Sequence, residues 1–198
     1  MRKLAVFNNI TLDGYFSAAN GDIGWAHGGG PDPEFDAFVA ENASGGGQLL
    51  LGRKTYDLMA GYWPTDMAKR NAPAVAEHMN RLPKVVFSRT LDRAAWSNTE
   101  VVKGDIAAAV RGMKEQPGPD MAILGSGSIV TQLAQAGLID EFQMVVNPVV
   151  LGGGRTMFDG LGSPMVLRLA GSRTFTHGKV FLRYESSATL MPPAASTP

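Results

Sequence analysis

The chain contains no cysteine, which excludes disulfides, thiolate metal sites and a cysteine nucleophile. It also lacks an excess of either charge, because 18 lysine and arginine residues balance 18 aspartate and glutamate residues without a block of like charges. Binding to nucleic acid or to an anionic membrane surface therefore has little support. The three histidines, His27, His78 and His177, have no paired spacing, so we expect no metal site.

Long apolar runs are missing as well. No stretch approaches the roughly 20 apolar residues of a membrane-spanning helix, and the first apolar stretch is too short for a signal peptide. We therefore expect a cytoplasmic protein. The 198 residues, 44% hydrophobic and 18% charged, are typical of one globular domain. We expect that domain over residues 1–186 and a disordered tail over residues 187–198.

Apolar runs alternate with segments of helical spacing along most of the chain. The expected strands are Leu4–Ile10, Gln48–Leu51, Lys84–Ser88, Glu100–Lys103 and Met121–Leu124. Helices are expected after Pro33, from Arg53, over Pro73–Met79, over Ile106–Glu115, and from Gly125 to near Gly137. After Ile139 we expect only strands, over Phe142–Val150, Met165–Ala170 and Lys179–Tyr184. This order predicts an α/β fold with a mixed sheet that is mostly parallel, has an antiparallel C-terminal extension and is flanked by helices.

Two strand-to-helix junctions are built alike, at Gly52 and at Gly125. A helix entered through glycine directs free backbone N–H groups and the positive end of its dipole toward an anion. If both strands are parallel in one sheet, the junctions open on the same edge and hold a pyrophosphate from both sides. The residues expected to bind the phosphates are Gly52, Arg53, Lys54 and Thr55 at the first junction and Gly125, Ser126, Gly127 and Ser128 at the second.

Neither junction carries a complete nucleotide-binding motif. Residues 47–55 nearly match a P-loop, but Arg53 displaces the lysine, and Gln48 and three leucines stand where the phosphate loop should be. The second junction begins the dinucleotide fingerprint, but Val130 replaces its third glycine. A P-loop and an ordinary Rossmann domain are therefore disfavoured. For each junction alone, a glycine that only lets strand and helix pack is the alternative.

A third strand end adds hydrogen-bond donors that could bind an anion. The strand Val85–Phe87 ends in Ser88-Arg89-Thr90, and an arginine between hydroxyls suits a phosphate monoester. Three strand ends that each offer donors to an anion suit a pyrophosphate together with a ribose phosphate. Because NADPH has such a ribose phosphate and NADH does not, this pattern favours NADPH. A solvated turn is the alternative for Ser88-Arg89-Thr90. The sequence has no Gly-x-Ser-x-Gly elbow, and hydride transfer needs none, because the cofactor carries the chemistry.

These motifs occur in an order that resembles proteins of the dihydrofolate-reductase fold. In this sequence they are Thr11–Tyr15, Gly21–Trp25, Leu50–Tyr56, Val86–Arg89 and Leu124–Gly127. The chain more narrowly resembles stand-alone relatives of the C-terminal reductase domain of the bifunctional riboflavin-biosynthesis deaminase-reductase. The later segments that match this subfamily are Asp140–Phe142, Asn147–Gly154 and Met157–Phe158. The resemblance spans Lys3 to Glu185.

The resemblance implies a dihydrofolate-reductase-like fold and an NADPH-binding reductase that is commonly a homodimer. Residues 52–55 match the family's cofactor-phosphate helix start, and residues 125–128 match its pyrophosphate loop. Ser88 and Arg89 match its ribose 2′-phosphate site. We expect no fused deaminase domain, because the zinc-binding cysteine and histidine pattern of that domain does not occur in this sequence.

The substrate side departs from the named enzymes, because Leu82-Pro83-Lys84 leads directly into the strand and no arginine occupies the place from which folate enzymes bind the folate glutamate. Asp36 stands at a spacing like that of their pterin-binding acid, and we expect it to donate the proton, with a pKa raised by burial among aromatic side chains. Asp13 is the second candidate. Tyr15 and Trp25 are expected to wall the substrate. The alternatives are a solvated flank position for Asp36 and a turn cap for Asp13.

The sequence therefore predicts an NADPH-dependent oxidoreductase that transfers a hydride to a small conjugated or heteroaromatic substrate, similar to a pterin or pyrimidinone. One rival is a nucleotide-binding protein of the same fold that does not turn over. The other is a structural dimer whose cleft is empty.

Overall fold

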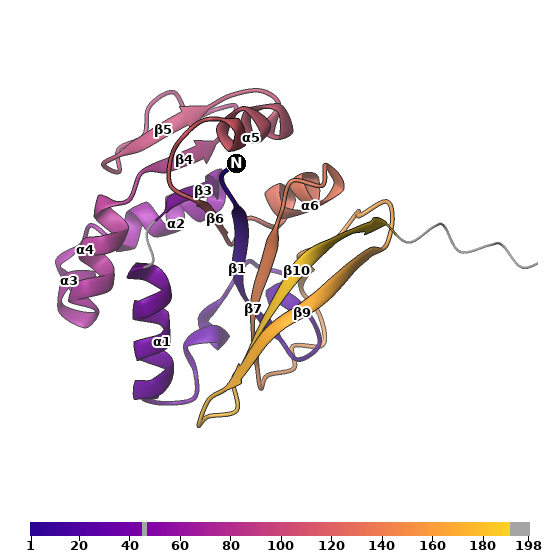
Figure 1. Ribbon diagram of the computed structural model, residues 1–198. Helices are drawn as coiled ribbons and strands as arrows, with labels where there is room; N and C mark the ends of the chain where they lie inside the picture. Colours follow the sequence, from indigo (N-terminus) through magenta and orange to yellow (C-terminus); the bar gives the residue numbers. More distant parts are fainter. Residues whose placement is uncertain (45–46, 191–198) are drawn as a thin grey trace, which may run out of the picture.

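The structure is a computed structural model that describes residues 1–44 and 47–190. Its helices are α1 (Pro33–Ser44), α2 (Arg53–Tyr62), α3 (Asp66–Asn71), α4 (Pro73–Arg81), α5 (Ile106–Glu115) and α6 (Gly127–Gln135), with a 3-10 turn η1 (Gly24–His27). Its strands are β1 (Leu4–Thr11), β2 (Tyr15–Ser17), β3 (Gln48–Gly52), β4 (Lys84–Phe87), β5 (Thr99–Val102), β6 (Met121–Leu124), β7 (Glu141–Asn147), β8 (Arg155–Thr156), β9 (Met165–Thr174) and β10 (Val180–Leu190). Figure 1 shows how they are arranged.

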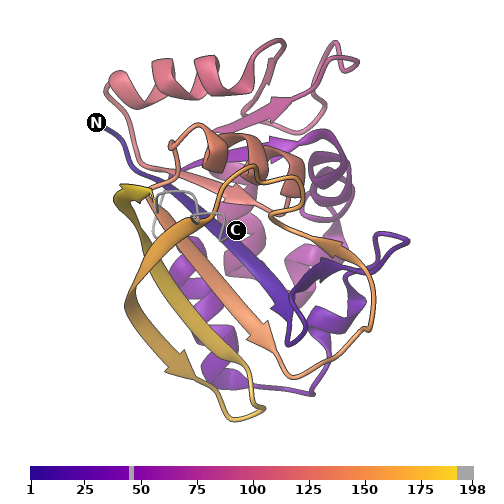
Figure 2. The ribbon, with the colours of Figure 1, turned by 90° about the vertical axis from the view of Figure 1, so that its right-hand side faces the viewer.

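The main sheet has eight strands in the order β5-β4-β3-β6-β1-β7-β10-β9. Neighbouring strands from β5 to β7 are parallel, and β10 is antiparallel to both β7 and β9. Figures 1 and 2 show β7, β10 and β9 side by side, coloured orange to yellow. The predicted fold class is thus confirmed. One detail differs: β7, expected in the antiparallel extension, pairs in parallel with β1.

The sheet separates two apolar cores. On one face Val6 of β1 packs in a cluster with Val110 of α5 and Leu133 of α6. On the other face Leu51 of β3 belongs to a cluster that includes Tyr56 of α2. Because both faces of β3 and β4 are covered, these two strands are apolar along most of their length, as the sequence pattern indicated.

Several element boundaries differ from those expected. β7 ends at Asn147 instead of residue 150, because Pro148 has no N–H to continue the ladder. β10 continues to Leu190, past the domain end expected at residue 186. The remainder of the expected disordered tail, residues 191–198, lies outside the described residues. The short elements α3, β2, β8 and η1 were not expected from the sequence.

Candidate active-site cleft

A cleft of about 1930 Å³ follows the carboxyl ends of the central parallel strands and continues along one sheet face beneath α1. Because β4, β3, β6 and β1 are parallel neighbours, their carboxyl ends lie in this order at one edge of the sheet. The structure brings every residue expected to bind phosphate to the wall of this one cleft. They are Gly52, Arg53, Lys54, Thr55, Ser88, Arg89, Gly125, Ser126, Gly127 and Ser128.

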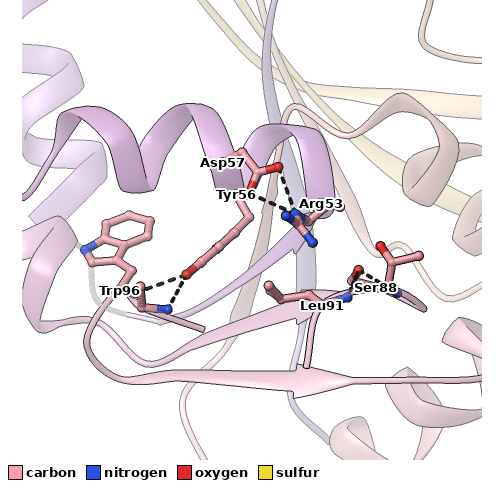
Figure 3. A network of polar contacts seen from close by, with 8 residues as sticks. Arg53, Tyr56, Asp57, Ser88, Leu91 and Trp96 are labelled. Atoms are coloured by element: carbon pink, nitrogen blue, oxygen red, sulfur yellow. Dashed lines mark hydrogen bonds and ion pairs between the residues drawn. The ribbon is translucent and has the colours of Figure 1, made fainter. Parts of the chain in front are cut away.

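Helix α2 begins at the carboxyl end of β3 and carries two cations into the cleft. The Arg53 Nε group pairs with both oxygens of Asp57, one turn along the same helix, at 2.9 and 2.8 Å (Figure 3). Lys54 lines the cleft without an ion-pair partner in residues 1–44 and 47–190. Tyr56 anchors the helix, because its hydroxyl oxygen accepts the backbone N–H of Trp96 at 3.1 Å. Because Arg53 is paired with Asp57 and Lys54 has no such partner among the described residues, Lys54 is more available to an anion than Arg53 is.

The turn between β6 and α6 has an unusual backbone. Gly125 has φ +59° and Ser126 has φ +60°, so two successive residues are left-handed. This conformation costs roughly 1–2 kcal/mol for a residue other than glycine. The Ser126 hydroxyl oxygen accepts the Gly52 N–H at 2.8 Å and lies 3.0 Å from the Thr55 hydroxyl oxygen. The two junctions are thus joined directly, and the Gly52 N–H is used inside the protein.

Asn8 of β1 holds the same turn from the opposite side. Its buried amide accepts the Gly125 N–H at 2.7 Å and donates to the Gly125 carbonyl oxygen at 3.2 Å and to the Met157 sulfur at 2.8 Å. The backbone N–H groups of Gly127 and Ser128, which begin α6, have no hydrogen-bond acceptor within the described residues. A helix start with free N–H groups and a fixed turn is prepared to bind an anion.

The end of β4 supplies a third set of donors. The Ser88 hydroxyl oxygen accepts the N–H groups of Thr90 and Leu91 at 3.3 and 3.0 Å, which shapes the turn after the strand. Figure 3 shows Ser88, at the end of β4, beside Arg53, which follows the neighbouring strand β3. Arg89 is exposed, lines the cleft and has no acidic partner in the described part of the chain. Its guanidinium is thus available for a bidentate contact with phosphate.

A small flap borders the cleft where α6 begins. It consists of β2 and β8, which pair antiparallel through Tyr15 and Thr156. Phe16 of this flap lies against Gly127, where a Cβ atom would come within 2.8 Å of the ring. Trp25 of η1 lines the cleft, as expected, whereas Tyr15 packs against Gly154 and is not among the lining residues.

Asp13 has a structural position outside the cleft wall. Its carboxylate accepts the Thr11 hydroxyl at 2.5 Å and the backbone N–H groups of Gly152 and Leu151 at 2.7 and 3.1 Å. The Thr11 hydroxyl lowers the pKa of Asp13 most, burial opposes it, and the N–H groups of Gly152 and Leu151 lower the pKa further, so that the net effect is a lowered pKa. A lowered pKa is the opposite of what a proton donor needs, and the geometry matches the alternative of a turn cap.

Asp36 is exposed and is not among the residues that line the cleft. Its expected burial among aromatic side chains is wrong. Phe35 and Phe38 instead pack against Phe175, with ring centroids 5.1 and 5.2 Å away, which turns the aromatic face of α1 toward the C-terminal hairpin. Val39 of the same helix lines the cleft. Asp36 thus has the solvated flank position that was its alternative.

Residues 1–44 and 47–190 hold no group of three or more histidine, aspartate or glutamate side chains placed to bind a metal ion. No helix within the same ranges has the length and apolar character needed to cross a membrane.

Comparison with known proteins adds a family and a fold. A model of the RibD C-terminal domain family matches residues 2–181. The uncharacterized protein YyaP of Bacillus subtilis (strain 168) is 30% identical over 92% of this chain and 94% of that protein. A second uncharacterized protein of the same organism, YwjB, is 25% identical over 88% of this chain and 92% of that protein.

Two solved structures have a similar fold. A putative riboflavin biosynthesis protein from Shewanella sp. PV-4 has a TM-score of 0.75 at 21% identity, covering 93% of this chain and 99% of that one. A diaminohydroxyphosphoribosylaminopyrimidine deaminase/5-amino-6-(5-phosphoribosylamino)uracil reductase from Thermotoga maritima has a TM-score of 0.66 at 14% identity, covering 94% and 57%. At these identities the likeness establishes the shared dihydrofolate-reductase-like fold.

Proposed function

The chain belongs to the RibD C-terminal domain family, as the order of its motifs predicted, and we propose that it is an NADPH-dependent oxidoreductase. In this proposal it transfers a hydride to a small conjugated or heteroaromatic substrate, similar to a pterin or pyrimidinone. Support comes from the family and from a relative that is named as a reductase of a pyrimidine derivative. The homodimer that the family resemblance implies belongs to the same proposal, and light scattering of the purified protein tests it.

One observation carries the cofactor proposal, namely the order in which cationic and N–H groups that can bind an anion lie along a single edge of the sheet. Arg89 follows β4, Lys54 follows β3, and the turn at residues 125–128 follows β6, with β1 next to it. Strands are about 4.8 Å apart, so this edge extends over roughly 14 Å from β4 to β1. A dinucleotide laid along it brings its 2′-phosphate to Arg89, its pyrophosphate to the start of α6 and its nicotinamide ring to β1.

NADPH is favoured over NADH because one of the two arginines at this edge has no acidic partner in the described ranges and is available to a phosphate. Arg53 is shared with Asp57, whereas Arg89 has no acidic partner among the described residues. Only NADPH has a 2′-phosphate that uses such a guanidinium, and a charge-assisted bond of this kind contributes about 1.5–3 kcal/mol. When bound, NADPH supplies the hydride, while the residues of this chain hold and orient the cofactor.

The position of Asp36 outside the cleft favours one rival, a nucleotide-binding protein without turnover. Two measurements separate the candidates. Titration with NADPH, followed by its fluorescence, should show saturable binding, and no binding would leave only the structural dimer. A screen of pterins, pyrimidinones and quinones for NADPH oxidation should then find at least one substrate. Tight NADPH binding with no oxidation by any of the three classes would support the rival.

A further inference from the structure

Beneath α1 the cleft extends over one row of the sheet. In register across neighbouring strands this row runs from Leu49 of β3 through Ala122 of β6 and Ala5 of β1 to Glu141 of β7, and all four residues line the cleft. The two alanines are the smallest side chains of the row and lie side by side, so the floor is hollow at its centre. We call this space, between Leu49 and Glu141, the alanine chamber.

The walls of the alanine chamber are apolar on most sides. Phe7 and Leu124 are register partners in the next row of the sheet, toward the carboxyl ends of the strands, and both line the cleft. Val39 of α1 and Met79 of α4 line it from the helical layer. An apolar space with few polar groups is typical of a site for a flat organic ring.

The polar groups of the chamber converge at one end. Asn42 of α1 donates to the Gln143 side-chain oxygen at 3.3 Å, and Gln143 donates to a Glu141 carboxylate oxygen at 2.5 Å. These bonds fix the Gln143 amide with its NH₂ group toward Glu141. A carboxylate has two oxygens and about four acceptor positions, so Glu141 retains capacity to accept further donors. Glu141 is half-buried and faces the chamber as an acceptor.

Most cations that line the cleft lie at the strand ends and on the flap, where Asp105 and Asp159 also line it. The cations at the strand ends and on the flap are Arg53, Lys54, Arg89 and Arg155. Glu141, by contrast, forms no ion pair with any lysine or arginine in residues 1–44 and 47–190. Lys3 and Asp120, which carry opposite charges, also line the cleft, and both are exposed. The chamber therefore attracts cations and hydrogen-bond donors and repels anions.

We propose that the alanine chamber binds a flat substrate that presents amino, amidino or ring N–H groups to Glu141, and that it rejects phosphorylated and other anionic compounds. The proposal rests on the proposed function, because it assigns the chamber to the substrate of that enzyme. It also separates this chain from the Thermotoga maritima relative, which is named for a phosphorylated substrate. Glu141 is the residue that determines this specificity.

A charge series of one planar shape tests the proposal. Benzamidine, benzamide and benzoate are cationic, neutral and anionic at neutral pH, and their binding to the full chain is measured by ligand-observed NMR with and without NADPH. Wild-type protein should bind benzamidine more tightly than benzamide, and benzoate least. Glu141→Gln should reduce the preference for benzamidine over benzoate by roughly tenfold, because it loses a charge-assisted bond. An unchanged preference in Glu141→Gln, or tighter binding of benzoate by wild type, overturns the proposal.

Two further variants complete the experiment. Glu185→Gln is the matched control, because Glu185 of β10 is the register partner of Glu141 but lies outside the cleft, paired with Arg168. It should leave the preference unchanged. Ala122→Val fills the chamber floor and should weaken all three probes, and normal binding by this variant also overturns the proposal. Failure of NADPH to bind contradicts the proposed function alone, since the probes are measured without cofactor too.

Discussion

At the scale of single residues, Asn8 has the clearest structural assignment in the cleft. Its buried amide bonds both the N–H and the carbonyl oxygen of Gly125. The turn that it holds includes Ser126 in a left-handed conformation, which is costly without support. Loss of the amide therefore lets the turn relax and displaces the free N–H groups that begin α6.

Asn8→Leu should weaken NADPH binding by roughly tenfold and lower the free energy of unfolding by about 1–3 kcal/mol, because the Gly125 peptide loses its partner. Asn80→Leu is the matched control. Asn80 also bonds the backbone, at the Trp63 and Ala76 carbonyl oxygens, but does not line the cleft. Calorimetry and denaturant unfolding should show a similar loss of stability for Asn80→Leu with normal NADPH affinity. Normal affinity in Asn8→Leu would remove Asn8 from cofactor binding.

The phosphate-binding turns could be predicted from the sequence, because a strand, a glycine and a helix in succession form a local pattern. The part played by Asn8 could not, because Asn8 and Gly125 are 117 positions apart and meet only when β1 lies beside β6. Asp36 shows a second limit. Helical spacing relates it to Phe35 and Phe38, but it does not tell which part of the chain covers that face.

At the scale of elements, the strands and helices that carry the cofactor edge were predictable, since they are long enough to show apolar runs or helical spacing. The flap was not. β2 has three residues and β8 has two, which is too short for an alternating pattern. Their pairing depends on a contact between segments far apart in the sequence, so only the folded chain reveals it.

The flap depends on glycine at position 154. A Cβ atom there would clash with the backbone carbonyl oxygen of Ser17, on the paired strand, whereas at Gly153 it would meet no atom within 4 Å. Gly154→Ala should thus lower the free energy of unfolding by about 1–3 kcal/mol, as overpacking does. Gly153→Ala, the matched control, should stay within about 0.5 kcal/mol of wild type in urea unfolding. Equal stability of the two variants would mean that the flap is not closely packed.

At the scale of the whole molecule, the cleft follows from the order of the strands. β3 and β6 are neighbours, although four helices and two other strands separate them in the sequence. Alternation of strands and helices predicted a parallel sheet, but it did not specify which strands are adjacent. The alanine chamber was unpredictable for the same reason, because Ala5, Ala122 and Glu141 form one row only through the register of three strands.

The proposal that this edge binds NADPH is tested most directly by the cofactor preference of Arg89→Ala, measured by isothermal titration calorimetry. The variant should bind NADPH about 10- to 100-fold more weakly than wild type, while its affinity for NADH changes by less than about twofold, because only NADPH loses a charge-assisted contact worth about 1.5–3 kcal/mol. Arg93→Ala, which removes an exposed arginine of the same loop outside the cleft, should leave both affinities unchanged. An equal loss of affinity for NADPH and NADH in Arg89→Ala, or no loss for either, would contradict the account.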